Sequence, residues 1–283
     1  MSFLDRLRAC SVFDASAYLP FHVDGARVGL VRPEFLARLR AFPNVFEASP
    51  DGVTLAAGLT GRDERTLAVD GVLQQLAADG VVSGWRGEAY TVAHALEGEP
   101  LFVMERAGIP KFGIRASGVH INGWVRDGET VSMWIGRRSP DKPTAPDKLD
   151  QIVAGGRSAL HTIHETVVKE AEEEAGIDAA LAARALPVGA ITYTTEREEG
   201  LRRDVLYVFD LELPADFVPV NQDGEIAEFQ LWPIARVIET VQETDDFKFN
   251  CALVVIDFLI RHGHIAPGTA EYLTLAHGLR SGF

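Results

Sequence analysis

The spacing of apolar and polar residues predicts short helices and strands in the first part of the chain. A helical spacing runs from Pro33 to Ala41 and again from Thr66 to Asp79, whereas Val28 to Val31 and Leu101 to Arg106 have strand character. Gly and Pro then interrupt the pattern between Ala107 and Gly113. These features predict a small α+β domain over residues 1–112.

The second part, residues 113–283, has the pattern of a mixed sheet flanked by helices. A turn at Asp127 and Gly128 joins two strand-like runs, VHINGWV and TVSMWIGRR, as in a β-hairpin. A polar loop from Ser139 to Lys148 follows. The remaining predicted elements are a helix from Ile163 to Ala175, strands from Gly189 to Thr195 and from Asp204 to Glu212, and an apolar helix from Asn250 to Arg261. The predicted fold class is α+β.

Charge and composition narrow the classes of partner. Of the 283 residues, 47% are hydrophobic, which is enough for a substantial buried core. The formal net charge of −14 is spread along the chain, so nucleic acid polymers and anionic membranes are disfavoured as partners. A small anionic substrate would need a local cluster of Lys and Arg, or divalent cations.

Cys10 and Cys251 are the only cysteines, too few for a disulfide framework and without the paired spacing of a zinc site. They are typical of packing residues in a reducing compartment. The segment from Met1 to Ala17 lacks the apolar core of a signal peptide, and no apolar run reaches membrane-spanning length. We therefore expect a cytoplasmic protein.

The segment VAGGRSALHTIHETVVKEAEEEAGI carries the strongest chemical signal. Thr162 and Glu165 have the spacing of a capping box, so the predicted helix begins at Ile163. Gly176 is expected to end it. The preceding pair, Gly155 and Gly156, lets the backbone approach a ligand or a metal ion closely.

The helical periodicity separates the acidic residues of this helix into two groups. An apolar arc faces the core and consists of Ile163, Val167, Val168, Ala171 and Ala175. Glu170 and Glu174 lie at the edge of that arc and Glu173 lies just outside it, while Glu165, Lys169 and Glu172 are predicted on the solvent side. Carboxylates next to a core are costly unless a cation neutralises them, which favours Mg²⁺ or Mn²⁺. The alternative is a plain solvated helix face.

The spacing of these residues resembles the Nudix box, in which Gly is followed after five residues by Glu and, after seven more, by Arg-Glu-apolar-any-Glu-Glu-any-Gly-apolar. The matching residues are Gly155, Glu170, Glu173, Glu174, Gly176 and Ile177. Two positions depart from the pattern, because His161 stands at the early Glu and Lys169 replaces the Arg. Lysine cannot reproduce the forked contact of a guanidinium, which bears on how the catalytic carboxylate is oriented.

The resemblance implies a Nudix-type α/β/α sandwich with a mixed sheet, preceded by a small α+β domain. It implies a hydrolase that cleaves a diphosphate by metal-assisted attack of water. The metal ligands would be Glu170, Glu173, Glu174 and the Gly155 carbonyl. Glu173 would be the base, with Glu225, from the loop after the helix, as second candidate; Glu225 could also be a simple turn charge.

Further segments resemble the Nudix branch related to thiamine pyrophosphokinase, which carries its own N-terminal domain. They are FGIRASGVHINGWV, MWIGRRS, KLDQIVAGG and PFHVDGARVGLVRPEF. This branch implies thiamine diphosphate or an oxidised analogue as the substrate, cleaved to the monophosphate and phosphate. Every candidate ligand lies in the second domain, so the first would shape substrate choice or assembly, a homodimer being one such assembly.

Basic and aromatic residues near the box are candidates for substrate binding. Arg137, Arg138 and Lys142 could hold phosphate oxygens, although each could equally be an exposed strand-end charge. Trp134, like Trp124, could stack on an organic ring, although tryptophans in strands more often belong to the core.

Two rival functions remain at this stage. An isomerase of the isopentenyl diphosphate type would need a cysteine at the active site, for which Cys251 is the candidate. A non-catalytic binding protein with a weakened Nudix fold would explain His161 and Lys169. His120, in VHING, is expected to be a buried, hydrogen-bonded histidine rather than a base.

Overall fold

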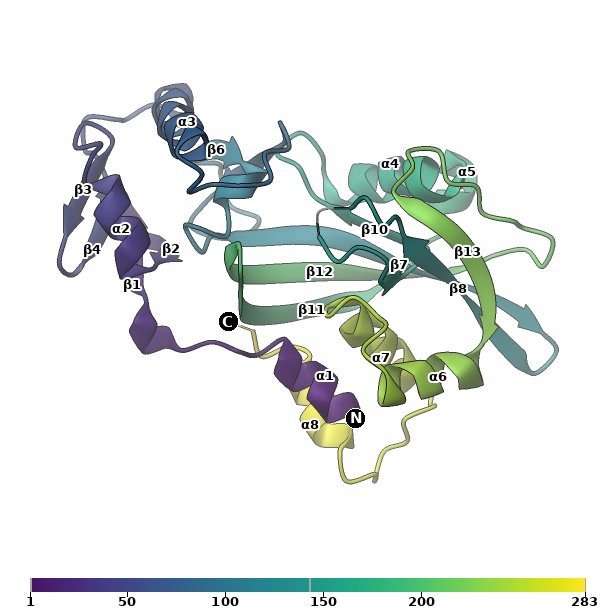
Figure 1. The fold of residues 1–283 in the computed structure, drawn as a ribbon. Coiled ribbons are helices and arrows are strands. Elements are labelled where there is room, and N and C mark those ends of the chain that lie inside the picture. The colour runs from purple at the N-terminus through teal and green to yellow at the C-terminus, as the bar shows by residue number, and fades with distance from the viewer. Residues whose placement is uncertain (1, 143, 283) are drawn as a thin grey trace.

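The computed structural model describes residues 2–142 and 144–282, so residue 143 of the predicted polar loop lies outside the described residues. The first unit holds a four-stranded sheet in the order β2-β1-β4-β3, a separate pair of strands and two α-helices (Figure 1). Its elements are β1 (Leu19–Val23), β2 (Ala26–Val31), α2 (Pro33–Leu39), β3 (Phe46–Ser49), β4 (Gly52–Leu55), α3 (Arg62–Ala78), β5 (Ala89–Val92), β6 (Phe102–Glu105) and the 3₁₀ turn η2 (Arg106–Gly108).

Phe112 closes the core of this first unit. Its ring lies 5.0 to 5.5 Å from the rings of Phe21, Phe35 and Phe46. The next residue, Gly113, has a φ of 54°, and a Cβ there would lie 2.4 Å from the carbonyl oxygen of Leu30. The punctuated segment predicted as a boundary is therefore packed into the structure rather than being a free linker.

The second unit is built on a seven-stranded mixed sheet. Its main order is β11-β12-β7-β8-β13, with β10 paired to β7 and β9 paired to β8. The pairing of β12 with β7 is parallel and the other pairings are antiparallel. The strands are β7 (Arg115–Asp127), β8 (Thr130–Arg138), β9 (Leu149–Asp150), β10 (Val153–Gly156), β11 (Leu186–Arg197), β12 (Gly200–Glu212) and β13 (Ile226–Pro233).

Helices cover both faces of this sheet, as the α/β/α prediction requires (Figure 1). One face carries α4 (Ile163–Ala175) and α5 (Ala179–Ala182), and the opposite face carries α6 (Ile234–Glu243) and α7 (Cys251–Arg261), with α8 (Tyr272–Gly278) packed on α7. Each face has its own apolar core, around Val167 on the α4 side and around Phe258 on the α7 side. The predicted bounds of α4 are confirmed, whereas α6 and α8 were not predicted.

Helix α1 (Phe3–Ala9) and the 3₁₀ turn η1 (Ala15–Ala17) precede the first sheet, but α1 packs against the second unit. Phe3 is 3% exposed and belongs to the same apolar core as Phe258. The Arg6 guanidinium donates to the Val241 carbonyl at 2.9 Å. The start of the chain therefore completes the core of its second part, which the division at residue 112 did not foresee.

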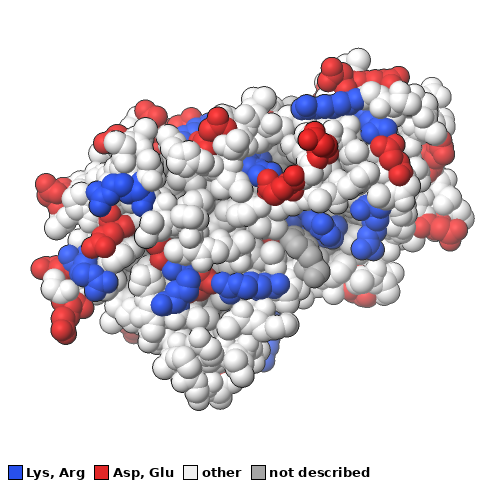
Figure 2. Space-filling view, turned by 180° about the vertical axis from the view of Figure 1, so that it is seen from behind, with Lys and Arg blue, Asp and Glu red and all other residues white. Residues whose placement is uncertain are grey.

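Charges are mixed over the surface. On the face that Figure 2 shows, Lys and Arg are interspersed with Asp and Glu. Within the described part of the chain, no helix is both long and apolar enough to cross a bilayer.

Truncation of Phe3 should test the place of α1. We expect Phe3→Ala to lower the free energy of unfolding by about 3 kcal/mol, the usual scale for deleting a buried aromatic ring. Chemical denaturation measures this value, with Val12→Ala as control because Val12 is 58% exposed. A loss similar to that of the control would show that α1 contributes little to the core.

Candidate active site

Helix α4 is fixed at both ends. The Thr162 hydroxyl accepts from the amide of Glu165 at 3.2 Å, and the Glu165 carboxylate accepts from the amide of Thr162 at 2.8 Å. Gly176 ends the helix with a φ of 64°, in the left-handed region. The caps set the ends of the helix, and the burial of Val167 and Ala171 in the core sets its rotation, so that the side of Glu170 and Glu174 faces β10.

Glu174 is a buried carboxylate, with 2% exposure. Its Oε2 accepts from the amide of Ala154 at 2.7 Å, which ties the helix to β10. Burial raises the pKa of Glu174 well above its ordinary value, although the Ala154 hydrogen bond opposes this. The negative charges of Asp150, Glu170 and Glu225 raise it further.

Glu170 is pressed against Gly155. A Cβ at Gly155 would lie 2.2 Å from the carboxyl carbon of Glu170, so only glycine allows this contact. The Glu170 side chain is 15% exposed, and burial is the main cause that raises its pKa. Two crowded, desolvated carboxylates offer the hard oxygen ligands that Mg²⁺ and Mn²⁺ prefer, so these residues fit a divalent metal ion.

Lys169 lies between two of the predicted ligands. Its ammonium is 2.6 Å from the Glu173 carboxylate and 3.1 Å from that of Glu170. The prediction that Lys169 points to the solvent side was wrong in this respect, because its long side chain extends toward Glu170 and Glu173. Glu173 is 47% exposed, and Glu172 is exposed as predicted.

The three box glutamates do not converge on one point. Within residues 2–142 and 144–282, the group of three whose ligand atoms all lie within 4.8 Å is a different one, described below. Glu173 is instead turned toward Lys169. The Gly155 carbonyl oxygen is directed at Gly118 of β7, 2.6 Å from where a Cβ would stand there. That the three glutamates and the Gly155 carbonyl bind one metal ion together stays a prediction.

Glu225, on the loop before β13, is within electrostatic range of Glu174. It forms an ion pair with Lys142, and its amide donates to the Asp223 carboxylate at 2.8 Å. Burial alone would raise the pKa of Glu225, but the Lys142 contact and nearby positive charges lower it overall. The second candidate base is therefore close to Glu174 and ionised.

The predicted basic cluster is not a single patch. Arg138 is 5% exposed and donates to Asp150 at 2.9 Å and to two loop carbonyls, so its guanidinium is already engaged. Arg137 pairs with Asp147 and Glu228, each at 3.2 Å, and keeps 39% exposure. Arg138 is thus unavailable to a ligand in this arrangement, because binding one would leave the buried Asp150 carboxylate unpaired.

The two tryptophans lie mainly in the cores. Trp134 is 9% exposed on the α4 side of the sheet, and Trp124 is 8% exposed near His262. The indole nitrogens of both are buried without a hydrogen-bond partner. Only the small exposed part of Trp134 could contact a substrate ring.

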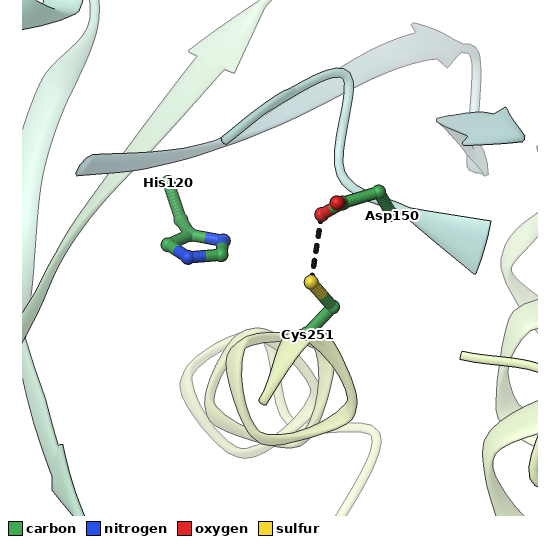
Figure 3. Close-up of side chains that lie close together, drawn as sticks. All are labelled: His120, Asp150 and Cys251. Carbon is green, nitrogen blue, oxygen red and sulfur yellow. Dashed lines mark hydrogen bonds between the residues drawn. The ribbon is translucent and has the colours of Figure 1, made fainter. Parts of the chain in front are cut away.

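A second polar cluster lies under the sheet, where Figure 3 shows Cys251 of α7 pointing at Asp150, with His120 beside them. The Cys251 thiol donates to the Asp150 carboxylate at 2.7 Å. His120 bonds to the side chain of Gln151 at 2.8 Å, and burial lowers its pKa to about 4. His120 is thus the buried, hydrogen-bonded histidine that was expected. Sequence reasoning missed Asp150, which follows the predicted polar loop and lies in the two-residue strand β9.

By spacing, His120, Asp150 and Cys251 could hold a metal ion. Two cations already neutralise the carboxylate, however, with Arg138 at 2.9 Å and Lys248 at 3.5 Å. A dication there would add to an excess of positive charge. Burial also raises the pKa of the Cys251 thiol well above its ordinary value, so this inert cysteine does not fit the isomerase alternative.

A cavity of about 560 Å³ lies away from the box, on the side of α1. Its lining includes Cys10, Tyr18, Tyr193, Arg203 and Gly282, with none of the box glutamates. Volume alone therefore does not mark the site on α4.

The crowded carboxylates of α4 beside a glycine strand fit a metal-dependent site for phosphate compounds, and comparison with known proteins shows the family. A family model described as NUDIX domain matches residues 116–252, and one described as Domain of unknown function (DUF4743) matches residues 2–116. Nudix hydrolase 20, chloroplastic, of Arabidopsis thaliana is 43% identical over 93% of this chain and 73% of its own length. Nudix hydrolase 24, chloroplastic, of the same plant is 43% identical over 99% and 78%.

An uncharacterized protein of Saccharomyces cerevisiae is 32% identical over 89% of this chain and 80% of its own length. The solved structure of a MutT protein from Methanosarcina mazei Go1 covers 52% of this chain and 95% of its own, at 17% identity and a TM-score of 0.40. The chain belongs to the Nudix hydrolase family. It is a hydrolase of pyrophosphate bonds, in a family that generally uses divalent metal ions.

Removing one charge from the buried pair should abolish turnover. We expect Glu170→Gln and Glu174→Gln each to lower kcat about 100-fold or more with an unchanged fold, because volume is kept while a ligand charge is lost. Steady-state rates with Mg²⁺ measure this, and the exposed Glu172→Gln is the matched control. Rates near that of the unchanged enzyme for both variants would end the assignment of the site.

Acid should destabilise the protein through His120. The unfolded chain takes up a proton near pH 6.5, whereas folded His120 takes it up only near pH 4. The free energy of unfolding therefore falls between those values, by about 3 kcal/mol at most. We expect His120→Gln to flatten this part of the stability profile and the exposed His277→Gln to leave it unchanged. The same dependence of the unfolding free energy on pH in the unaltered protein and in both variants would contradict the burial of a neutral imidazole.

Proposed function

We propose that this Nudix hydrolase cleaves the diphosphate group of a small organic phosphate with Mg²⁺ or Mn²⁺. The observation that carries the proposal is the pair Glu170 and Glu174, which α4 presses against β10 where burial raises both pKa values. A divalent ion at this pair would favour the ionised carboxylates, lower the pKa of water and neutralise phosphate charge. Glu170, Glu174, Glu173 and the Gly155 carbonyl would hold it.

Glu173 is the proposed base. It is the most exposed of the three box carboxylates, so water can reach it, whereas Glu174 is enclosed. Lys169, 2.6 Å away, would orient Glu173 in place of the arginine of the family pattern. Glu225 is the second candidate, since it lies near Glu174 and its contact with Lys142 keeps it ionised.

Lys142 and Arg137 are the proposed phosphate-binding residues on this side of the site. Both are held by carboxylates, Lys142 by Glu225 and Arg137 by Asp147 and Glu228. Exposed ion pairs contribute little to stability, so Arg137, which keeps 39% exposure, could exchange its partners for a phosphate oxygen. Lys142 is 16% exposed and would have to leave Glu225 to bind one.

The location is a proposal too. A reducing compartment such as the cytoplasm is supported by two free, buried cysteines, Cys10 and Cys251. The plant relatives are named chloroplastic, which concerns those proteins.

The substrate that we propose is thiamine diphosphate or an oxidised analogue, cleaved to the monophosphate and phosphate. Its support is the resemblance of the segments around the box, together with the aromatic edge of Trp134. We expect kcat/KM for thiamine diphosphate or its oxidised form to exceed those for ADP-ribose and nucleoside triphosphates, measured under one Mg²⁺ condition. A preference of about tenfold or more for a nucleotide would overturn the thiamine assignment and leave the hydrolase in place.

A further inference from the structure

The first unit reaches the box through the loop that connects β10 to α4. The amide of Ala159 donates to the carbonyl of Ala89, the first residue of β5, at 2.8 Å. Arg157 forms an ion pair with Glu97 at 2.9 Å, and the Tyr207 hydroxyl donates to the same Glu97 carboxylate at 2.7 Å. Backbone and charged contacts together hold this loop against the first unit.

Tyr90 and Arg106 stand where the two units meet. A Cβ at Gly156 would lie 1.8 Å from the Tyr90 hydroxyl oxygen and 3.4 Å from the guanidinium carbon of Arg106. Gly156 follows Gly155, which touches the carboxyl group of Glu170. A side chain at Gly156 would clash with Tyr90, which accounts for the second glycine of the pair. Side chains of the first unit therefore lie next to the proposed metal ligands.

The charge of Arg106 acts on the same site. Its guanidinium lies 5.5 Å from the Tyr90 ring centre, a cation–π distance, and donates to Glu88 at 2.8 Å. Its positive charge contributes to lowering the pKa of Glu225, and the charge of Glu88 contributes to raising that of Glu170. Two residues of the first unit are therefore within electrostatic range of the carboxylates.

Arg106 has hydrogen-bond donors to spare. Its side chain keeps 44% exposure, whereas Arg138 is engaged with a buried carboxylate. Among the bonds of the described residues, the Arg106 guanidinium makes one, to Glu88, and its planar fork has five N–H donors. Such a fork matches two oxygens of a phosphate group, which a lysine cannot do.

We propose that Arg106, positioned by Tyr90, binds phosphate oxygens of the substrate, so that the first unit supplies part of the active site. The substrate class rests on the proposed function, a diphosphate. The chemical machinery would then not lie in the second unit alone, contrary to the expectation from the sequence positions of the candidate ligands. The first unit would be a permanent wall of the site, not a separate module.

Binding and turnover are measured on the full-length protein, with Mg²⁺ present in both. Calorimetry with inorganic pyrophosphate gives Kd without requiring hydrolysis, and thiamine diphosphate and ADP-ribose give kcat and KM. We expect Arg106→Gln to weaken pyrophosphate binding about tenfold or more, the scale of a lost charged hydrogen bond, and to raise KM more than it lowers kcat. Arg106→Lys should recover part of the loss. Arg62→Gln, exposed on the same unit, is the matched control.

Glu88→Gln separates substrate binding from a structural ion pair. It breaks the contact with Arg106 but leaves the guanidinium in place, so we expect pyrophosphate binding to be kept or tightened. Equal losses in Glu88→Gln and Arg106→Gln would assign the effect to the ion pair and overturn the proposal. Unchanged Kd in Arg106→Gln, or no pyrophosphate binding by the unaltered protein, would overturn it as well. An unaltered protein that binds pyrophosphate through Arg106 but hydrolyses neither diphosphate would instead count against the proposed function alone.

Discussion

The contact of α4 with β10 is the constraint on which the site depends. The carboxyl group of Glu170 occupies the volume that a side chain at Gly155 would need, and Glu174 is bound by the amide of Ala154. Since both glutamates are one turn apart on a helix with fixed ends, their backbone positions are fixed relative to each other. A desolvated pair of carboxylates follows directly from this packing.

Basic residues around the site neutralise part of the negative charge that this packing creates. Lys169 lies between Glu170 and Glu173, and Lys142 neutralises Glu225. Below the sheet, Arg138 and Lys248 do the same for Asp150, at the cost of being unavailable to a ligand. In a chain with a net charge of −14, these cations are already engaged with carboxylates, whereas the buried Glu174 is bound by the amide of Ala154 instead.

The two units pack against each other at several points. Phe3, at the start of the chain, lies in the core beneath the large sheet, while the loop before α4 is held by Glu97 and by the backbone of Ala89. Such interlocked contacts make the relative position of the units part of the active-site geometry, since a shift of the first unit would move Tyr90 away from Gly156.

The sequence by itself determined α4, its caps and the separation of Glu170 and Glu174 from Glu172, because these depend on neighbours within one or two helical turns. It also determined the hairpin of β7 and β8 through the local turn chemistry. Only the tertiary structure decided that Arg138 serves Asp150 and that Tyr90 meets Gly156. Each of these pairs joins segments that are brought together by the packing of sheets and helices. The local spacing of apolar residues carries no information about such contacts.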